Sequence, residues 1–177
     1  MSEIVKRYEE KRSLSEKIAS YIPGYRGYKQ KEVRREADKL VRDFMVRKLS
    51  EARGHLKDAT RSVAEAEAAQ LYKLLNRVSA VMDRVINKIE HADYGYSGLF
   101  DLVKVREEEL DKLLEYDHGL LSRCEEIVNI AAEVSGTAAA GSFDVLPGKL
   151  KQLELKLQEL QKMFASREEI ITSVRGG

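Results

Sequence analysis

Apolar residues recur every three to four positions over long stretches of the chain, a spacing that predicts α-helices. We expect five helices, which cover about residues 3–20, 30–52, 56–89, 106–134 and 149–172. Gly54 either ends the second helix or lies inside a helix that continues past it. The predicted fold class is therefore all-α, an antiparallel bundle of four to five long helices with a C-terminal coiled-coil-like helix.

Two connections between these helices alternate aromatic residues with glycines. The first reads Tyr-Ile-Pro-Gly-Tyr-Arg-Gly-Tyr over residues 21–28, and the second reads His-Ala-Asp-Tyr-Gly-Tyr-Ser-Gly-Leu-Phe over residues 91–100. Because alternate turns of an up-down bundle lie at the same end, we expect the two connections to meet there. The rings either close the end of the bundle or line a small-molecule or metal site formed by Tyr25, Tyr28, Asp93, Tyr94 and Tyr96.

The last predicted helix carries leucines at alternating steps of three and four, the spacing of a coiled coil. It follows a run of small residues over 136–148 that predicts a flexible loop. We therefore expect a bundle over residues 1–135, this loop, and a C-terminal helix over 149–172 that packs on the bundle or on another copy. The candidate interaction residues on this helix are Leu150, Leu153, Leu157 and Leu160.

Charge is unevenly distributed along the chain, although the net charge is only +1. Residues 26–57 contain eleven Lys or Arg against five Asp or Glu, and residues 90–117 contain nine acidic against three basic residues. These segments either neutralise each other in the fold or leave a basic helix face for an anionic membrane. That face would consist of Arg34, Arg35, Arg42 and Lys48. With so small a net charge, we expect no nucleic-acid partner.

The sequence contains no recognisable catalytic or cofactor-binding motif. A di-metal helical bundle needs two Glu-x-x-His pairs, and the chain has one, Glu115 with His118, so we predict no metal and no cofactor. The single Cys124 cannot form an internal disulfide and lies among apolar residues. Asp117 falls on or beside the apolar stripe of its helix, where a carboxylate either reaches the rim or pairs with a basic group.

The chain has no apolar run of about 18 residues and therefore no predicted transmembrane helix. Its charged N-terminus does not have the pattern of a signal peptide. We expect a cytoplasmic protein.

The two aromatic–glycine segments resemble those of a family of uncharacterised prokaryotic all-helical proteins, with IPGYxGY and HADYGYxG turns. The resemblance covers about residues 20–50 and 85–117 and includes the charged segment from Lys31 to Leu40. It implies a prokaryotic, cytoplasmic protein, and it implies no activity or site.

These patterns predict a non-enzymatic interaction or scaffold protein that acts through helix–helix contacts with a protein partner or with itself. Peripheral binding to an anionic membrane and a ligand or metal site at the tyrosine–glycine turns are the two alternatives. Helical bundles also host chemistry, so an enzyme stays open as a further alternative.

Overall fold

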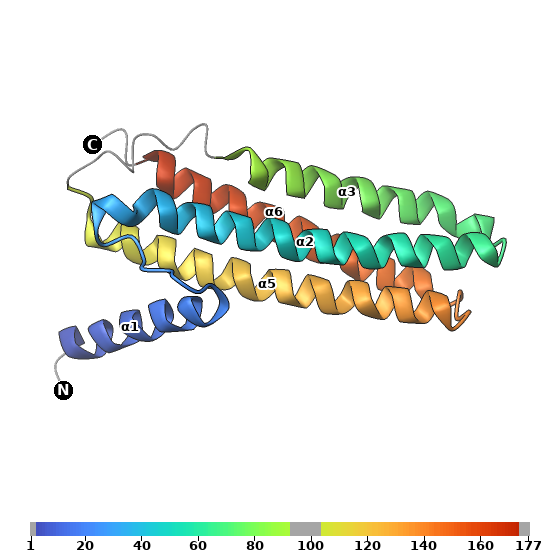
Figure 1. The fold of residues 1–177 in the computed structure, drawn as a ribbon, viewed down its shortest axis with the longest axis horizontal. Helices are drawn as coiled ribbons and strands as arrows, with labels where there is room; N and C mark the ends of the chain where they lie inside the picture. The colour runs from blue at the N-terminus through green and yellow to red at the C-terminus, as the bar shows by residue number, and fades with distance from the viewer. Residues whose placement is uncertain (1–2, 93–103, 174–177) are drawn as a thin grey trace.

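The computed structural model describes residues 3–92 and 104–173, and helices account for nearly all of this part (Figure 1). In chain order the elements are α1 (Glu3–Tyr21), η1 (Lys31–Val33), α2 (Arg34–Glu65), η2 (Ala69–Leu71), α3 (Tyr72–Glu90), α5 (Glu107–Ala139) and α6 (Leu146–Ser173). The described ranges contain no strand, and the helices pack on one another, which confirms the predicted all-α bundle. None of these helices is long and apolar enough to cross a membrane.

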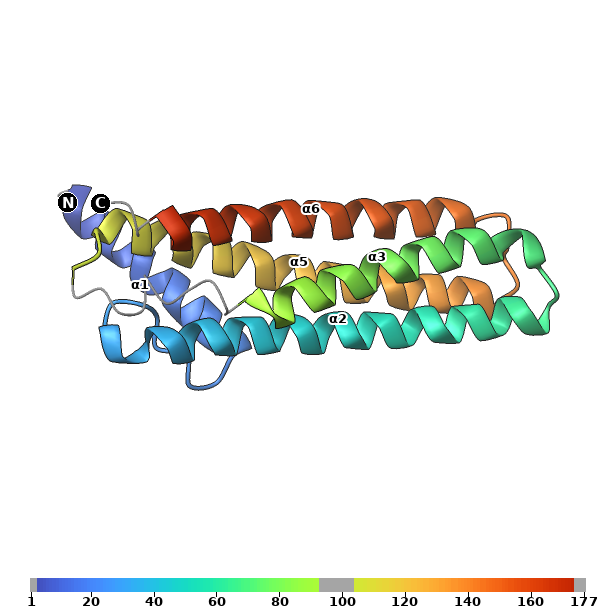
Figure 2. The same cartoon turned by 90° about the horizontal axis from the view of Figure 1, so that it is seen from above.

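Four long helices, α2, α3, α5 and α6, form the bundle (Figures 1 and 2). Each helix packs on two others: α2 lies against α5 and α3, and α6 lies against α5 and α3. Consecutive helices alternate in direction, but α2 and α5, which pack most extensively, run the same way. Each helix therefore has one antiparallel and one parallel neighbour.

The leucines of the C-terminal helix belong to the core of this bundle. Leu150, Leu153, Leu157 and Leu160 have no exposed surface, because α6 packs its apolar stripe on α5 and α3. Another protein therefore cannot contact these side chains in this fold. The prediction that they are interaction residues is wrong. The spacing that predicts a coiled coil is also the spacing of a bundle core.

Of the two alternatives for Gly54, the structure has the helix that continues past it, and the break between α2 and α3 lies at a place where none was predicted. α2 continues through Gly54 to Glu65, and the chain reverses over residues 66–71. Two hydrogen bonds close the end of α2, from Glu67 N–H to the Ala64 carbonyl and from Ala68 N–H to the Val63 carbonyl, each with an N–O distance of 3.1 Å. This is a Schellman motif, and Glu67 occupies its left-handed position with φ of 56°.

The connection between α5 and α6 is shorter than predicted. α5 extends to Ala139, and α6 begins at Leu146, so most of the small residues expected in a loop are helical. Gly141 has φ of 73° and ends α5 in a second Schellman motif. Its N–H bonds the Ala138 carbonyl, and Ser142 N–H bonds the Thr137 carbonyl.

The helix α1 lies outside the four-helix bundle, alongside the N-terminal half of α5 (Figure 1). Only Ile18 among its residues is buried. The chain then turns over residues 22–30 and enters α2 through η1.

Candidate functional site

The turn after α1 folds against the bundle and buries two tyrosines. Gly24 and Gly27 have φ of 87° and 74°, a conformation that side chains disfavour, so the glycines make this turn possible. Tyr25 is 6% exposed and Tyr28 is 3% exposed. Their rings meet edge to face with 6.1 Å between centroids.

Of the five residues of the predicted end pocket, the structure describes only Tyr25 and Tyr28. The buried positions of Tyr25 and Tyr28 match the simpler expectation of rings that close the end of the bundle. Asp93, Tyr94 and Tyr96 lie outside the described residues.

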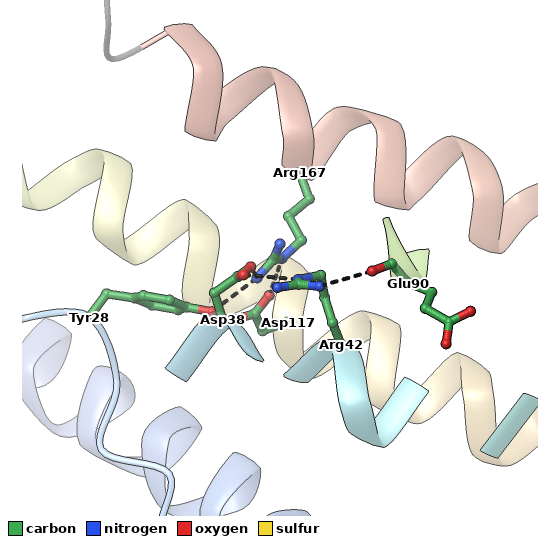
Figure 3. Close-up of polar contacts among 6 residues, drawn as sticks. All are labelled: Tyr28, Asp38, Arg42, Glu90, Asp117 and Arg167. Carbon is green, nitrogen blue, oxygen red and sulfur yellow. Dashed lines mark hydrogen bonds and ion pairs between the residues drawn. The ribbon is translucent and has the colours of Figure 1, made fainter. Parts of the chain in front are cut away.

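Beneath this turn, five side chains from four segments form a buried ion-pair network (Figure 3). The Tyr28 hydroxyl donates a hydrogen bond to Asp117 on α5. Arg167 on α6 donates from Nε to Asp117 Oδ1 at 2.6 Å and places Nη2 at 3.1 Å from the Tyr28 hydroxyl. The same Nη2 lies 2.8 Å from Oδ1 of Asp38 on α2. Asp38 also accepts a hydrogen bond from Arg42, with 2.9 Å between Oδ2 and Nε.

The network is balanced in charge, with two arginines and two carboxylates. Arg167 and Asp117 have no exposed surface, and Asp38 is 1% exposed. Removing such groups from water is costly unless each charge keeps its partners. The network therefore forms only when α2, α5, α6 and the tyrosine turn are aligned so that all five side chains meet.

Burial and neighbouring charges fix the protonation of the network. Burial and the negative charge of Asp117 raise the pKa of Tyr28 well above its ordinary value. Burial lowers the pKa of Arg167, but Asp117, Tyr28 and Asp38 outweigh it and raise that pKa. Burial raises the pKa of Asp117, opposed by the charge and hydrogen bond of Arg167. At neutral pH Tyr28 keeps its proton and Arg167 its charge, so the network joins the helices and is poorly suited to proton transfer.

The proposed basic face of α2 is not a continuous surface, which corrects that prediction. Arg34 is 3% exposed and donates from Nε to the Tyr28 carbonyl at 2.8 Å, and Arg42 is 7% exposed and belongs to the network. Lys48 Nζ lies 3.1 Å from Glu125 Oε1 on α5. Of the four residues, only Arg35 is exposed. The reason is that α2 packs between α3 and α5 and presents little of this face to solvent.

Sequence reasoning found one member of the network and missed two others. Of the two alternatives for Asp117, reaching the rim or pairing with a basic group, the structure has the second, with Arg167 as the partner. Arg167 itself continues the apolar stripe of α6 in the steps Leu160, Phe164, Arg167 and Ile171. Asp38 similarly lies between the buried residues Ala37 and Val41 on α2. A charged residue at a core position of the helical repeat was therefore the signal available in the sequence.

At the other side of the turn, a cavity of about 270 Å³ lies between α1, residues 26–29 and the start of α5. Lys11 on α1 forms ion pairs across it, with Nζ at 2.8 Å from Asp111 Oδ2 and 3.2 Å from Glu107 Oε1. Tyr28 is among the residues that line this cavity, and its hydroxyl joins the buried network. The cavity and the network thus share one residue.

No protein-family model, curated protein or solved structure matches this chain. Within residues 3–92 and 104–173, no group of three or more His, Cys, Asp or Glu side chains is placed to hold a metal ion. Cys124 is fully buried, and burial raises the pKa of its thiol, so it is not a reactive nucleophile.

Proposed function

We propose that this chain is a protein-interaction module, in which the four-helix bundle is the rigid support and α1 is the recognition helix. The observation that carries the proposal is how little of α1 is buried within the described part of the structure. α1 and α3 both have 19 residues, but α1 buries only Ile18. α3 buries seven residues: Leu75, Val78, Val81, Met82, Val85, Ile86 and Ile89.

The exposed apolar side chains of the described part gather on α1. Five large hydrophobic residues are exposed in the described part of the chain. Three of them lie within the first two turns of α1: Ile4 is 80% exposed, Val5 43% and Tyr8 61%. Ile4 and Tyr8 are four residues apart and therefore lie on the same side of the helix. Contiguous exposed apolar groups are typical of surfaces that bind another protein.

The first half of α1 contacts the bundle in a different way from its end, where Leu14, Ile18 and Tyr21 pack on the core. Charged side chains attach it to α5, through Lys11 with Asp111 and Glu107, and through Arg7 Nη2 at 3.7 Å from Asp111. Apolar side chains near its start are left to solvent. A surface helix normally buries its apolar side and exposes its charges. A partner that covers Ile4, Val5 and Tyr8 would remove this unfavourable exposure.

The mode of binding that fits is a helix in a groove. In such complexes an amphipathic helix inserts apolar residues at spacings of three and four into an apolar groove of the partner. Ile4 and Tyr8 supply that spacing, and Val5 widens the patch. The expected partner is therefore a protein with an apolar groove, either a different chain or a second copy.

The test is a quantitative pull-down with the tagged full chain from cells that naturally make it, followed by mass spectrometry. The variant Ile4→Ser/Val5→Ser removes apolar surface from α1 without touching the core. Leu155→Ser is the matched control, because Leu155 is 54% exposed but lies on α6. We expect a stoichiometric partner that the α1 variant loses and the control retains.

Light scattering on the purified chain decides whether that partner is a second copy, since self-association would double the mass and the α1 variant would restore the monomer. Circular dichroism of each variant verifies that the helices are intact. A partner retained equally by both variants, or no partner at all together with a monomeric chain, would contradict the assignment of α1.

A further inference from the structure

The cavity between α1, residues 26–29 and α5 is lined by both apolar and cationic side chains. The apolar ones are Tyr8 on α1 and Leu110 and Leu114 on α5. Three cationic side chains, Arg12, Arg26 and Lys29, also line it. Its volume of about 270 Å³ is near the lower end of the range for small-molecule pockets.

The three cationic groups are available to a ligand. Arg12 pairs with Glu16 and Arg26 with Glu36, but all four side chains are more than half exposed, and such surface pairs contribute little. Lys29 has no carboxylate within ion-pair distance in the described ranges, and its Nζ lies 6.0 Å from the centroid of the Tyr8 ring. An anion entering the cavity would therefore displace only weak contacts.

The two carboxylates that border the cavity are already engaged. Glu107 and Asp111 both pair with Lys11, and this leaves the three other cations without a strong competitor inside the cavity. The pKa of Glu107 is lowered, chiefly by the hydrogen bond and charge of Lys11 and further by the charges of Lys29 and Arg7. With Lys11, Arg12, Arg26 and Lys29 against Glu107 and Asp111, the side chains that line the cavity carry a formal net charge of +2.

We propose that this cavity binds a phosphate monoester attached to a flat ring, a ligand of mononucleotide size. The ring would stack on Tyr8 against the two leucines, as bases do on aromatic side chains. The phosphate would replace Glu16 as partner of Arg12 and Glu36 as partner of Arg26, and it would also pair with Lys29. All three are donors that suit a dianion.

This site shares Tyr8 with the apolar patch on α1 but does not include Ile4 or Val5, and it adds a ligand to the proposed interaction module. The ligand would touch α1, the tyrosine turn and α5 at once. Binding would therefore hold α1 in place against the bundle.

Isothermal titration of the full chain with adenosine 5′-monophosphate at low salt tests the proposal. We expect saturable binding, with adenosine and inorganic phosphate each at least about tenfold weaker, because each lacks one of the two recognised parts. Lys29→Gln and Arg12→Gln should weaken the nucleotide several-fold, and Tyr8→Leu should weaken the nucleotide but leave inorganic phosphate unchanged. All three side chains are at the surface, so the fold should survive each change.

Lys151→Gln is the control, since it removes the same charge from an exposed residue near the start of α6, at the other end of the bundle (Figure 1). Ile4→Ser/Val5→Ser should bind the nucleotide normally, which separates this site from the proposed protein interface. No detectable binding of the nucleotide, equal binding of adenosine, or equal losses in Lys29→Gln and Lys151→Gln would each overturn the proposal.

Discussion

Arg167 and Asp117, fifty positions apart in the chain, form a fully buried ion pair with 2.6 Å between Nε and Oδ1. The pair joins α6 to α5 below the tyrosine turn, and Asp38 and Tyr28 extend it to α2 and to the turn itself (Figure 3). The tyrosine turn is thus attached to the bundle through a buried hydrogen bond from the Tyr28 hydroxyl to a carboxylate. Its rigidity depends on keeping every partner.

Removal of the Arg167 guanidinium should destabilise the fold strongly. Arg167→Met leaves the buried carboxylates of Asp38 and Asp117 without their shared partner, and we expect a loss of about 3–5 kcal/mol in the free energy of unfolding. Urea denaturation followed by circular dichroism measures it. Lys162→Met, an exposed position on the same helix, should change the stability by less than about 0.5 kcal/mol. Equal effects of the two substitutions would mean that the pair contributes nothing specific.

The hydroxyl of Tyr28 should confer a pH dependence at the alkaline end. Its pKa is raised in the folded protein, by burial and by Asp117, above the ordinary value of 10.0. The stabilisation is therefore fully present below about pH 10 and is lost as the pH rises further, because only the unfolded chain ionises readily. Tyr28→Phe should cost about 1.5–3 kcal/mol at neutral pH through the lost hydrogen bond to a charged group.

The test compares the unfolding free energies of the wild type and of Tyr28→Phe, measured between neutral pH and about pH 11. The wild type should lose stability more steeply with pH than Tyr28→Phe, which has no ionisable group at this position. Tyr25 is also buried with a raised pKa, so part of the slope should remain in the variant. Parallel slopes for the two proteins would show that Tyr28 is not the group that titrates.

The apolar periodicity predicted the helices well, because a helix must bury one side whatever its neighbours are. It could not distinguish a bundle core from a coiled-coil interface, since both use the spacing found in α6. It also missed the turn after α2, where a sequence of Ala, Glu and Gln has no glycine or proline to indicate a break. There Glu67 adopts the left-handed conformation that glycine usually supplies.

The same limit applies to the sites. Asp117 was recognisable as a carboxylate at a core position, but its partner comes from α6, and helical spacing within one element does not show which residues of another element lie opposite. The exposed start of α1 was equally unpredictable, because its thin apolar stripe suits a packed helix as well as a bare one. Only the arrangement in space separates these cases.

The leucines of α6 should control the stability of the monomer. Leu157→Ala removes a fully buried side chain and should cost about 2–5 kcal/mol in the free energy of unfolding. Leu155→Ala, two residues away and 54% exposed, should cost less than about 0.5 kcal/mol. Chemical denaturation gives both values, and light scattering should find the same mass for the wild type and both variants. A change in mass with unchanged stability would indicate that Leu157 packs in an interface between two copies of the chain.

Two glycines should respond in opposite ways to alanine. Gly54 lies inside α2 with no atom within 4 Å of an added Cβ, so Gly54→Ala should stabilise the protein by about 0.5–1 kcal/mol. Gly27 has φ of 74°, which a side chain disfavours, so Gly27→Ala should destabilise it by about 1–2 kcal/mol. Thermal melting ranks the two variants directly. A lower melting temperature for Gly54→Ala would show that α2 is distorted at this position.

The attachment of α1 to α5 should depend on salt and on acid, because charged groups make it. The pKa of Glu107 is lowered from 4.5, by its hydrogen bond to Lys11 and by that cation's charge. The attraction is therefore present above about pH 4.5 and is lost as the pH falls through the lowered value. The pKa of Lys11 is raised, by its hydrogen bond to Asp111 against the effect of burial, so its contribution is lost only at strongly alkaline pH.

Spin labels on Glu9→Cys and Lys112→Cys, both exposed, would report the distance between α1 and α5. Cys124 is fully buried, so it should stay unlabelled. We expect one narrow distance distribution at neutral pH and low salt, and a broad one at about pH 3 or in roughly 1 M salt, where ion pairs are protonated or screened. Labels on Lys112→Cys and Lys162→Cys, within the bundle, should keep a narrow distribution throughout. If the distribution from α1 stays equally narrow, apolar contacts around Ile18 hold the helix and the ion pairs do not.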